Sequence, residues 1–341
     1  MIADTSGNGV LPRYERSGLA QIFLPRSPLS VCAWLGLFGL CRQATAGSRQ
    51  QAAGRAHLFA CRPARHDDWR MLPGPSEQSY IHGYHDSVLR SHRRRTAQNS
   101  AAHLLAHLDP TSRLLDVGCG PGTITVDLAA RCPAGEVVGV DAAAEVLEEA
   151  VAEARSRECD NVTFEVGDVY HLRFADGAFD VVHAHQVLQH LSDPVAALVE
   201  MRRVCRPGGL VAVRDADYGA MFWFPDVPGM EEWRTLYRRV ARAAGGEPDA
   251  GRRLLSWARA AGFAEVAASA SAWCFATLEE RNWWAGLWAE RLTSSRLAEQ
   301  AIGLEIADTI ALEGLADAWR AWGAYDDACF VVPHGELICT N

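Results

Sequence analysis

Apolar residues follow two alternating patterns from about Ser76 onward: short continuous runs, and longer stretches with helical spacing. The short runs have the length and composition of buried strands; they occupy residues 113–117, 136–140, 162–166, 179–184 and 210–214. The stretches between them resemble helices and occupy residues 123–131, 143–157 and 194–205. This alternation predicts an α/β fold with a mostly parallel sheet and helices on both faces.

The pattern changes after Asp215, where aromatic residues and long helical stretches dominate. Helices are expected at about 230–244, 249–261 and 277–325, and strands at 263–275 and 329–340. We expect the last two strands to form an antiparallel pair that completes a seven-stranded sheet. The insertions at about 218–245 and 277–325 then form a helical cap over the cleft. Helical spacing also occurs at 96–108, ahead of the first strand.

The basic residues are unusual, because all 33 are Arg and the chain contains no Lys. This composition excludes a P-loop lysine and a Schiff-base lysine. The net charge is -9, and the acidic excess lies after residue 70. An acidic surface repels phosphate, so nucleic acid is not an expected partner. The one basic cluster, Arg90 to Arg95, is interpreted as a solvated helix face.

Ten cysteines are scattered without a Cys-x-x-Cys pair. Reduced thiols in a cytoplasmic protein explain this distribution better than a disulfide framework. No cysteine lies at ligand spacing from another ligand, and His183 and His185 alternate along a strand, so no metal site is expected.

The stretch from Leu114 to Thr123 is the most informative part of the chain. An apolar strand there leads into glycines at 118, 120 and 122 and then into a helix. Glycines allow a ligand to approach the backbone closely, and Asp116 can accept hydrogen bonds from a ligand. Two further strands end in acids, Asp141 and Asp168. In an open parallel sheet the ligand lies at these strand ends, so they predict a small polar cofactor.

The glycine spacing helps to choose between NAD and S-adenosylmethionine. A dinucleotide fingerprint requires Gly-x-Gly-x-x-Gly or Ala, but the residue three positions after Gly120 is Thr123. Three strand-end carboxylates would repel a pyrophosphate and attract a sulfonium. The pattern therefore favours S-adenosylmethionine.

These motifs as a set resemble those of class I S-adenosylmethionine-dependent methyltransferases, including the ubiquinone and menaquinone biosynthesis C-methyltransferases. Residues 115–122 match the first motif of that Rossmann-like family, and 188–194 with 203–209 match the helix and turn before the fifth strand. The resemblance implies the following cofactor contacts: Asp116, Gly118, Cys119, Gly120 and Gly122 at the methionine end, Asp141 and Ala142 at the ribose, Asp168 and Val169 at the adenine, and the backbone of His185 and Gln186 opposite the methyl group.

The methyl acceptor and any catalytic base are less well defined. We rank His190 first as a catalytic base and His85 second, since histidine readily takes a proton near pH 7. Other candidates are His82, His185, Asp215 and Asp217, whereas His183 is interpreted as a satisfied core histidine. Aromatic residues could form an apolar acceptor pocket; the candidates are Tyr80, Tyr84, Phe222, Trp223, Trp283, Trp284 and Trp288.

The sequence thus predicts a cytoplasmic methyltransferase that acts on a small, apolar or aromatic metabolite. The alternatives are an NAD(P)-dependent oxidoreductase and a non-catalytic cofactor-binding module.

Residues 71–341 are expected to form the methyltransferase domain, with its core at 76–275. Residues 1–70 contain one apolar island, 29–41, which is too short to span a bilayer. The island resembles a secretory signal. We favour a disordered or non-native extension ahead of a start at Met71, because export would remove the protein from an intracellular cofactor.

Overall fold

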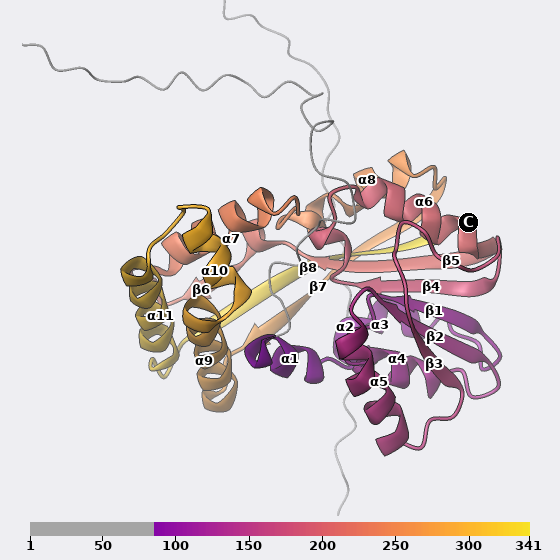
Figure 1. Cartoon of the computed structure of the whole chain (residues 1–341), viewed down its shortest axis with the longest axis horizontal. Helices are drawn as coiled ribbons and strands as arrows, with labels where there is room; N and C mark the ends of the chain where they lie inside the picture. Colours follow the sequence, from indigo (N-terminus) through magenta and orange to yellow (C-terminus); the bar gives the residue numbers. More distant parts are fainter. Residues whose placement is uncertain (1–84) are drawn as a thin grey trace, which may run out of the picture. The chain divides into compact units, whose positions relative to one another are not determined.

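The computed structural model describes residues 85–341. Several sequence predictions lie outside this part: the extension 1–70, the start at Met71, and the roles of Tyr80, His82 and Tyr84. Within the described residues, eight strands form one sheet in the order β3-β2-β1-β4-β5-β8-β6, and β7 also pairs with β8. The α/β architecture with its mostly parallel sheet is confirmed (Figure 1).

The strands agree closely with the apolar runs of the sequence. Their bounds are β1 Arg113–Val117, β2 Glu136–Asp141, β3 Val162–Val166, β4 Phe179–His185, β5 Cys205–Ala216, β6 Phe222–Phe224, β7 Glu265–Phe275 and β8 Cys329–Thr340. Strands β1 to β5 pair in parallel, and β8 pairs antiparallel with β5, β6 and β7. The antiparallel pair is therefore confirmed. The seven-strand prediction missed β6, because only three residues of the aromatic stretch after Asp215 pair with β8.

The α-helices of the described part are α1 Asp86–Arg93, α2 Ala97–Ser100, α3 Ala102–Leu105, α4 Thr123–Ala129, α5 Ala144–Ser156, α6 Pro194–Val204, α7 Met230–Ala243, α8 Leu254–Ala260, α9 Leu278–Ser294, α10 Arg296–Gly303 and α11 Thr309–Gly323. Short 3-10 turns are η3 Leu188–His190, η4 Tyr218–Ala220 and η5 Ala250–Arg252. No helix among residues 85–341 is long and apolar enough to cross a membrane.

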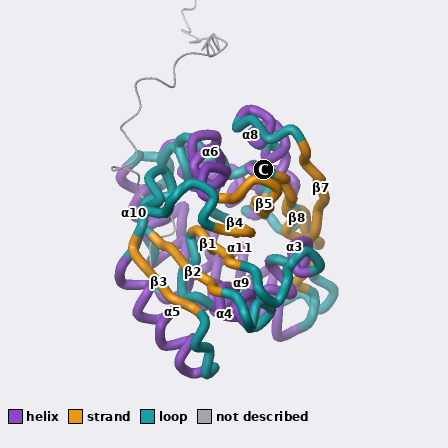
Figure 2. The backbone as a smooth tube through the Cα atoms, turned by 90° about the vertical axis from the view of Figure 1, so that its right-hand side faces the viewer, coloured by secondary structure: helices purple, strands orange, loops and turns teal. Residues whose placement is uncertain are grey.

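Side-chain alternation divides the sheet into two covered faces. Leu115 and Val117 of β1 pack with α6 and α8, whereas Leu114 packs with α2, α3 and α4. Figure 2 shows the parallel strands side by side, with α6 and α8 on one side and α4 and α5 on the other. Asp116 has the same parity as Leu114, so it lies on the face covered by α2 to α4.

Two predicted helices are divided in the structure. The segment 96–108 forms α2 and α3, which separate at Ala101, where φ is -135°. Ala97, Ala101 and Leu104 all pack in the same core, so the break directs both short helices toward the sheet. The segment 277–325 forms α9, α10 and α11, because Ser295 and Asp308 cap new helices.

The C-terminal helices and α7 enclose an aromatic core of their own. Trp233, Trp288 and Trp319 are fully buried there, and their rings contact one another and Phe330 of β8. Figure 1 shows α7, α9, α10 and α11 gathered at one end of the molecule, with β7 and β8 running from the main sheet into this cap. The helical cap is thus joined to the sheet by two long continuous strands.

Candidate active site

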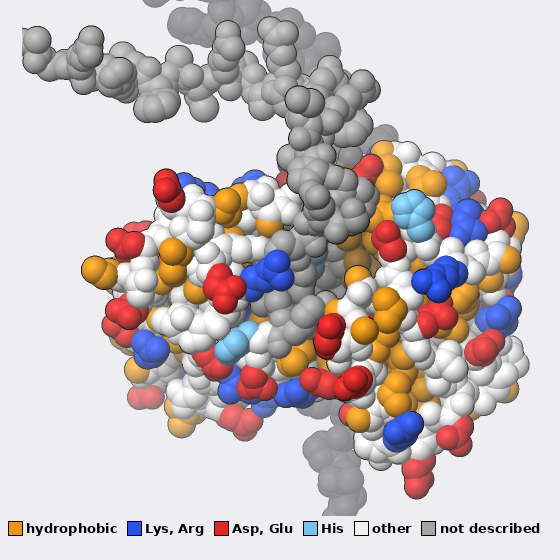
Figure 3. Space-filling model, viewed as in Figure 1, with side chains coloured by type: hydrophobic (Ala, Val, Ile, Leu, Met, Phe, Trp, Pro, Cys, Tyr) orange, Lys and Arg blue, Asp and Glu red, His pale blue; other side chains and the backbone are white. Residues whose placement is uncertain are grey.

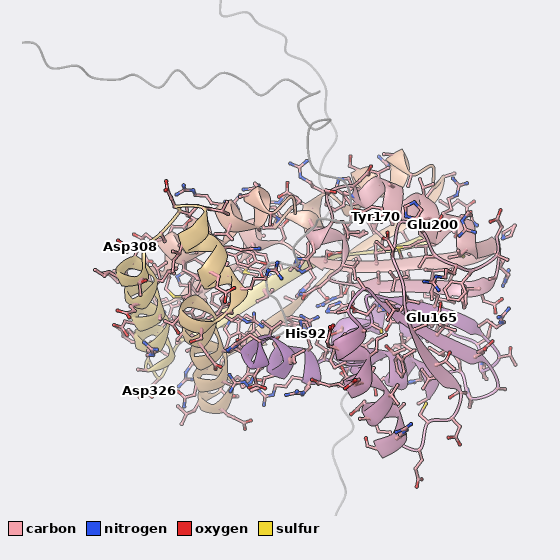
Figure 4. The ribbon with its side chains drawn as sticks, in the orientation of Figure 1. His92, Glu165, Tyr170, Glu200, Asp308 and Asp326 are labelled. Carbon is pink, nitrogen blue, oxygen red and sulfur yellow. The ribbon has the colours of Figure 1, made fainter. Side chains whose placement is uncertain are left out.

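A cavity of about 630 Å³ lies at the carboxyl ends of the parallel strands, between the sheet and helices α1 and α9. It collects most of the site residues predicted from the sequence; Asp116, Gly118, Cys119, Gly120, Asp141, Ala142, Asp168, Val169, His185, Gln186 and His190 all line it. Gly122 and His85 do not line it. Figure 4 marks His92 of α1 and Tyr170 after β3, which also belong to its wall.

The glycine loop after β1 is shaped by close backbone approach. Gly118 has φ +69°, and a Cβ atom there would lie 2.4 Å from Val187 Cγ2. Gly120 has φ +53° and faces more open space. Gly122 caps α4, and a Cβ atom there would lie 2.8 Å from Ala150 Cβ. Gly122 therefore allows α4 to pack on α5, while Gly118 and Gly120 form the cavity wall.

Asp141 ties the glycine loop to the end of β2. Its carboxylate accepts hydrogen bonds from the backbone N–H of Gly120 (2.9 Å) and of Ala143 (3.1 Å). Burial raises the pKa of this carboxyl above its usual value, although the backbone hydrogen bonds oppose the shift. Asp168, after β3, is about half exposed and accepts a hydrogen bond from the backbone N–H of Tyr170 (2.9 Å).

Asp116 is held by two internal hydrogen bonds. One carboxylate oxygen is 2.7 Å from His183 Nδ1, and the other accepts from the Thr125 hydroxyl at 2.6 Å. Each carboxylate oxygen can accept a second hydrogen bond, so these contacts fix the group without preventing a ligand contact. His183 is fully buried, as a core histidine should be, but its Nε2 has no partner among the described residues.

Polar side chains cross the sheet on the face that carries Asp116. We call this set the polar belt; it comprises Asp116, His183, His185, Arg214, His334 and Glu336. The belt follows the strand pairing, in which Asp116 is opposite His183, His185 opposite Arg214, and Arg214 opposite Glu336. Arg214 donates to Glu336 at 3.1 Å, and burial lowers the pKa of Arg214 to about 10.

Four histidines on or beside the cavity wall are neutral at pH 7. Burial, followed by the positive charge of Arg95, lowers the pKa of His190 to about 3. Burial and nearby arginines also lower the pKa values of His92, His185 and His334 well below 6.5. Each ring therefore offers one N–H donor and one acceptor nitrogen.

The hydrogen bonds of Gln189 indicate which ring nitrogen of His190 carries the proton. The Gln189 side-chain oxygen accepts from the Ala216 backbone N–H at 3.2 Å, which orients the amide group. The side-chain nitrogen of Gln189 (Nε2) then donates a hydrogen bond to Nε2 of the His190 ring at 3.0 Å. The lone pair of His190 Nε2 is thus engaged, and the proton of the neutral ring lies on Nδ1.

Of the other base candidates, His185 lines the cavity, whereas His85, Asp215 and Asp217 lie outside its wall. His85 caps α1 by accepting from the Ser87 N–H at 3.3 Å, and it lies 3.8 Å from Glu290. Asp217 is bound by the Arg252 guanidinium through both oxygens. Asp215 accepts from the Gln189 backbone N–H at 3.0 Å, and burial raises its pKa to about 7. Asp215 therefore supports the turn that carries His190.

Arg95 and His92 are wall residues that the sequence did not reveal. The solvated-face interpretation of residues 90–95 was wrong for Arg95, which donates to the Gln186 side-chain oxygen at 2.7 Å and lines the cavity. Arg93 and Arg94 are more exposed and pair with Glu149 and Glu279, although Arg94 also lines the cavity. The sequence could not show which of these arginines lines the cavity and which is paired at the surface, because their partners lie far away in the chain.

Aromatic residues form the half of the wall nearest the cap. Trp283 and Trp284 line the cavity as predicted, and Tyr218, Met221, Trp273 and Phe275 join them. Trp288 is instead fully buried in the cap core, Trp223 stacks on Phe330, and Phe222 is exposed. The alternating pattern of this strand in the sequence suggested no role for Trp273 and Phe275, which the structure places on the partly buried face of β7.

The fold and the site together define an α/β protein with a cavity at a glycine loop and acidic strand ends. No group of three or more His, Cys, Asp or Glu side chains in the described part is placed to hold a metal ion.

Comparison with known proteins agrees with this class. A family model described as a methyltransferase domain matches residues 108–267. An uncharacterised methyltransferase of Schizosaccharomyces pombe is 37% identical over 275 residues, which are 77% of this chain and 97% of that protein. The ubiquinone/menaquinone biosynthesis C-methyltransferase of Bdellovibrio bacteriovorus is 41% identical over 101 residues, 30% of this chain and 43% of that enzyme. The chain therefore belongs to the class I methyltransferase family.

Among solved structures, the YcgJ protein from Bacillus subtilis is one that matches part of this chain. It has a TM-score of 0.48 and 18% identity and covers 72% of this chain and 99% of that chain. The oxidoreductase and non-catalytic alternatives gain no support from the comparisons.

Proposed function

We propose that this protein transfers a methyl group from S-adenosylmethionine to a small, apolar or aromatic acceptor. The proposal rests mainly on one observation. Asp116, Asp141 and Asp168, which come from the ends of three different strands, line the same cavity as the glycine loop. Such a wall suits a cationic nucleoside cofactor without phosphate groups.

The wall also offers groups for each part of the cofactor. Asp141 can take the ribose hydroxyls, and Asp168 with Val169 can border the adenine. The amine of the methionine tail can approach Asp116 and the Gly118–Gly120 backbone. The carboxylate of that tail needs a cationic partner, and Arg95 is suitably charged and lies on the same wall.

S-adenosylmethionine supplies an already activated methyl group on a sulfonium. The residues of the chain have to bind both reactants, align them for in-line displacement and exclude water. Gln186 is held by Arg95 and by His334, so its backbone is fixed where the family resemblance implies the methyl group. The aromatic side chains Tyr218, Phe275, Trp283 and Trp284 can enclose the acceptor.

Calorimetric titration with S-adenosylmethionine tests this proposal. We expect the wild type to bind, and Asp141→Ala to bind at least tenfold more weakly because the ribose and the glycine loop both lose a partner. Glu145→Ala is the matched control, since this exposed acid lies four residues away, outside the cavity wall. No binding by the wild type, or equal binding by Asp141→Ala, would contradict the proposal.

We further infer a cytoplasmic protein that does not act on nucleic acid. Two observations support this: the seven cysteines of the described part are free thiols, and the face shown in Figure 3 carries Asp and Glu interspersed with Arg. A basic surface suited to nucleic acid would concentrate Arg on one face.

A further inference from the structure

His185 is a buried imidazole on the cavity wall whose ring nitrogens are unpartnered. It ends β4, is 5% exposed, and neither Nδ1 nor Nε2 has a hydrogen-bond partner in the part of the chain that is described. Leaving a buried polar group unsatisfied costs about 1–3 kcal/mol. Such a group on a cavity wall points to a ligand that satisfies it.

The surroundings of His185 keep the ring neutral and fixed in orientation. The Trp273 ring lies 5.7 Å away, and the His334 ring stacks on it at 6.2 Å between centroids. Burial, Arg95 and Arg214 lower the pKa of His185 well below 6.5. The neutral ring therefore has one lone pair and one N–H with which to bind a ligand at pH 7.

Three neighbouring histidines each have one ring nitrogen bound within the protein. His183 Nδ1 binds Asp116, His334 Nε2 accepts from Gln186, and His190 Nε2 accepts from Gln189. His103 also has two unpartnered nitrogens, but it does not line the cavity. Of the two rings here whose nitrogens are both unpartnered, His185 is the one that lines the cavity.

We propose that the methyl acceptor carries a hydroxyl group, and that the ring of His185 binds this hydroxyl and takes its proton during transfer. The inference rests on the proposed methyltransferase function and names its substrate class. The aromatic wall contributed by Trp273, Trp283 and Trp284 would hold the apolar body of the same molecule. His185 was predicted to contact the cofactor through its backbone, so its side chain remains available for the acceptor.

The step balances as a simple displacement. The hydroxyl oxygen forms a bond to the methyl carbon, and the carbon–sulfur bond breaks with its electron pair remaining on sulfur. The O–H bond breaks, and the proton passes to the unprotonated nitrogen of His185. An oxygen that has gained a methyl group while keeping its proton is a much stronger acid than imidazolium, so a weakly basic histidine is sufficient.

Two matched probes test this inference without knowledge of the natural acceptor. The affinities of 2-naphthol and of 2-methoxynaphthalene are measured by fluorescence titration with S-adenosylhomocysteine bound. We expect the wild type to bind 2-naphthol about tenfold more tightly, because only the naphthol donates a hydrogen bond. Equal affinities, or no binding of 2-naphthol, would overturn the inference without any variant.

Variants then assign the preference to His185. His185→Phe should keep the ring stacking and the affinity for S-adenosylhomocysteine. It should bind 2-naphthol and 2-methoxynaphthalene with about equal affinity. His185→Gln should restore part of the preference, since an amide oxygen can accept the hydroxyl proton. His107→Phe, an exposed histidine outside the wall, should behave as the wild type. A preference that survives in His185→Phe would overturn the assignment.

The same titrations separate the two proposals. Failure of the wild type to bind S-adenosylhomocysteine would refute the methyltransferase function itself. Normal cofactor binding without a preference for 2-naphthol would refute only the role of His185.

Discussion

Gly118 is the residue at which the backbone of the site leaves least room for change. Its φ of +69° is a conformation that L side chains rarely adopt, and Val187 Cγ2 would be 2.4 Å from an added Cβ atom. Val187 follows Gln186 directly, so the glycine loop and the end of β4 are packed against each other here. A side chain at 118 would separate two parts of the cavity wall.

We expect Gly118→Ala to lower the free energy of unfolding by about 2–4 kcal/mol, combining the cost of a left-handed alanine with that of overpacking. Gly286→Ala is the control, because this helical glycine of α9 has no atom within 4 Å of an added Cβ. It should raise the stability by about 0.5–1 kcal/mol. Urea unfolding measures both changes, and a Gly118→Ala protein as stable as the wild type would contradict the close approach.

Asp215 gives a second prediction for a single residue. Burial raises its pKa to about 7, whereas an unfolded aspartate titrates near 3.8. The folded protein therefore holds this proton between about pH 4 and 7, and the contribution of Asp215 to stability falls as the pH rises through that window. Asp215→Asn cannot ionise, and its amide oxygen can still accept from the Gln189 N–H.

We expect the variant to gain stability relative to the wild type between pH 5 and 7, by at most about 1.4 kcal/mol per pH unit. The difference should level off above about pH 8. Urea unfolding of both proteins at pH 5, 6, 7 and 8 measures it. A difference that stays constant across this series would show that Asp215 is ionised throughout.

The sequence predicted the residues at the strand ends, but it did not predict what these residues bind within the protein. Asp141 and Asp168 follow apolar runs directly, so local pattern was enough to place them on the cavity. The partner of Asp116, in contrast, is His183, which is 67 residues away in the chain. This contact depends on the register of β1 against β4, which a single sequence does not specify.

At the level of helices and strands, the short runs were predicted best and the long helical stretches least well. The bounds of β3 and β8 coincide with the predicted ones. The division of 277–325 was missed although Asp308 carries a recognisable N-cap pattern, accepting from the Ala311 N–H at 2.8 Å. Helical periodicity continues across these breaks, because α9, α10 and α11 all turn apolar faces to the same aromatic core.

A substitution at Trp319 measures how much this aromatic core contributes to the stability of the cap helices. It belongs to α11, is fully buried, and its ring contacts Trp233 of α7 at 4.6 Å and Phe330 of β8 at 5.1 Å. Trp319→Ala should cost about 3–5 kcal/mol of unfolding free energy. Ile310→Ala, at a side chain that is 79% exposed on the same helix, should change it by less than about 0.5 kcal/mol. Similar thermal stability of both variants would show that the core is not cooperative with α11.

For the molecule as a whole, the buried histidines predict a strong dependence of stability on pH. Five of them have pKa values below 6.5, chiefly because of burial: His92, His103 (about 4), His185, His190 (about 3) and His334. In the unfolded chain each titrates near 6.5, so unfolding takes up protons below that pH. Their contribution to stability is complete above pH 6.5 and is lost as the pH falls.

At pH 5, His103 and His190, with pKa values of about 4 and about 3, each favour the unfolded chain by about 2 kcal/mol relative to pH 8. The lowered pKa values of His92, His185 and His334 act in the same direction. Asp215 opposes this by about 3 kcal/mol, since its protonation favours the folded state. We therefore expect a lower melting temperature at pH 5 than at pH 8, which tryptophan fluorescence will report because the cap core holds several buried tryptophans. His103→Gln, away from the cavity wall, should recover about 2 kcal/mol of the loss, and a melting temperature equal at pH 5 and 8 would mean that these rings are protonated in the folded protein.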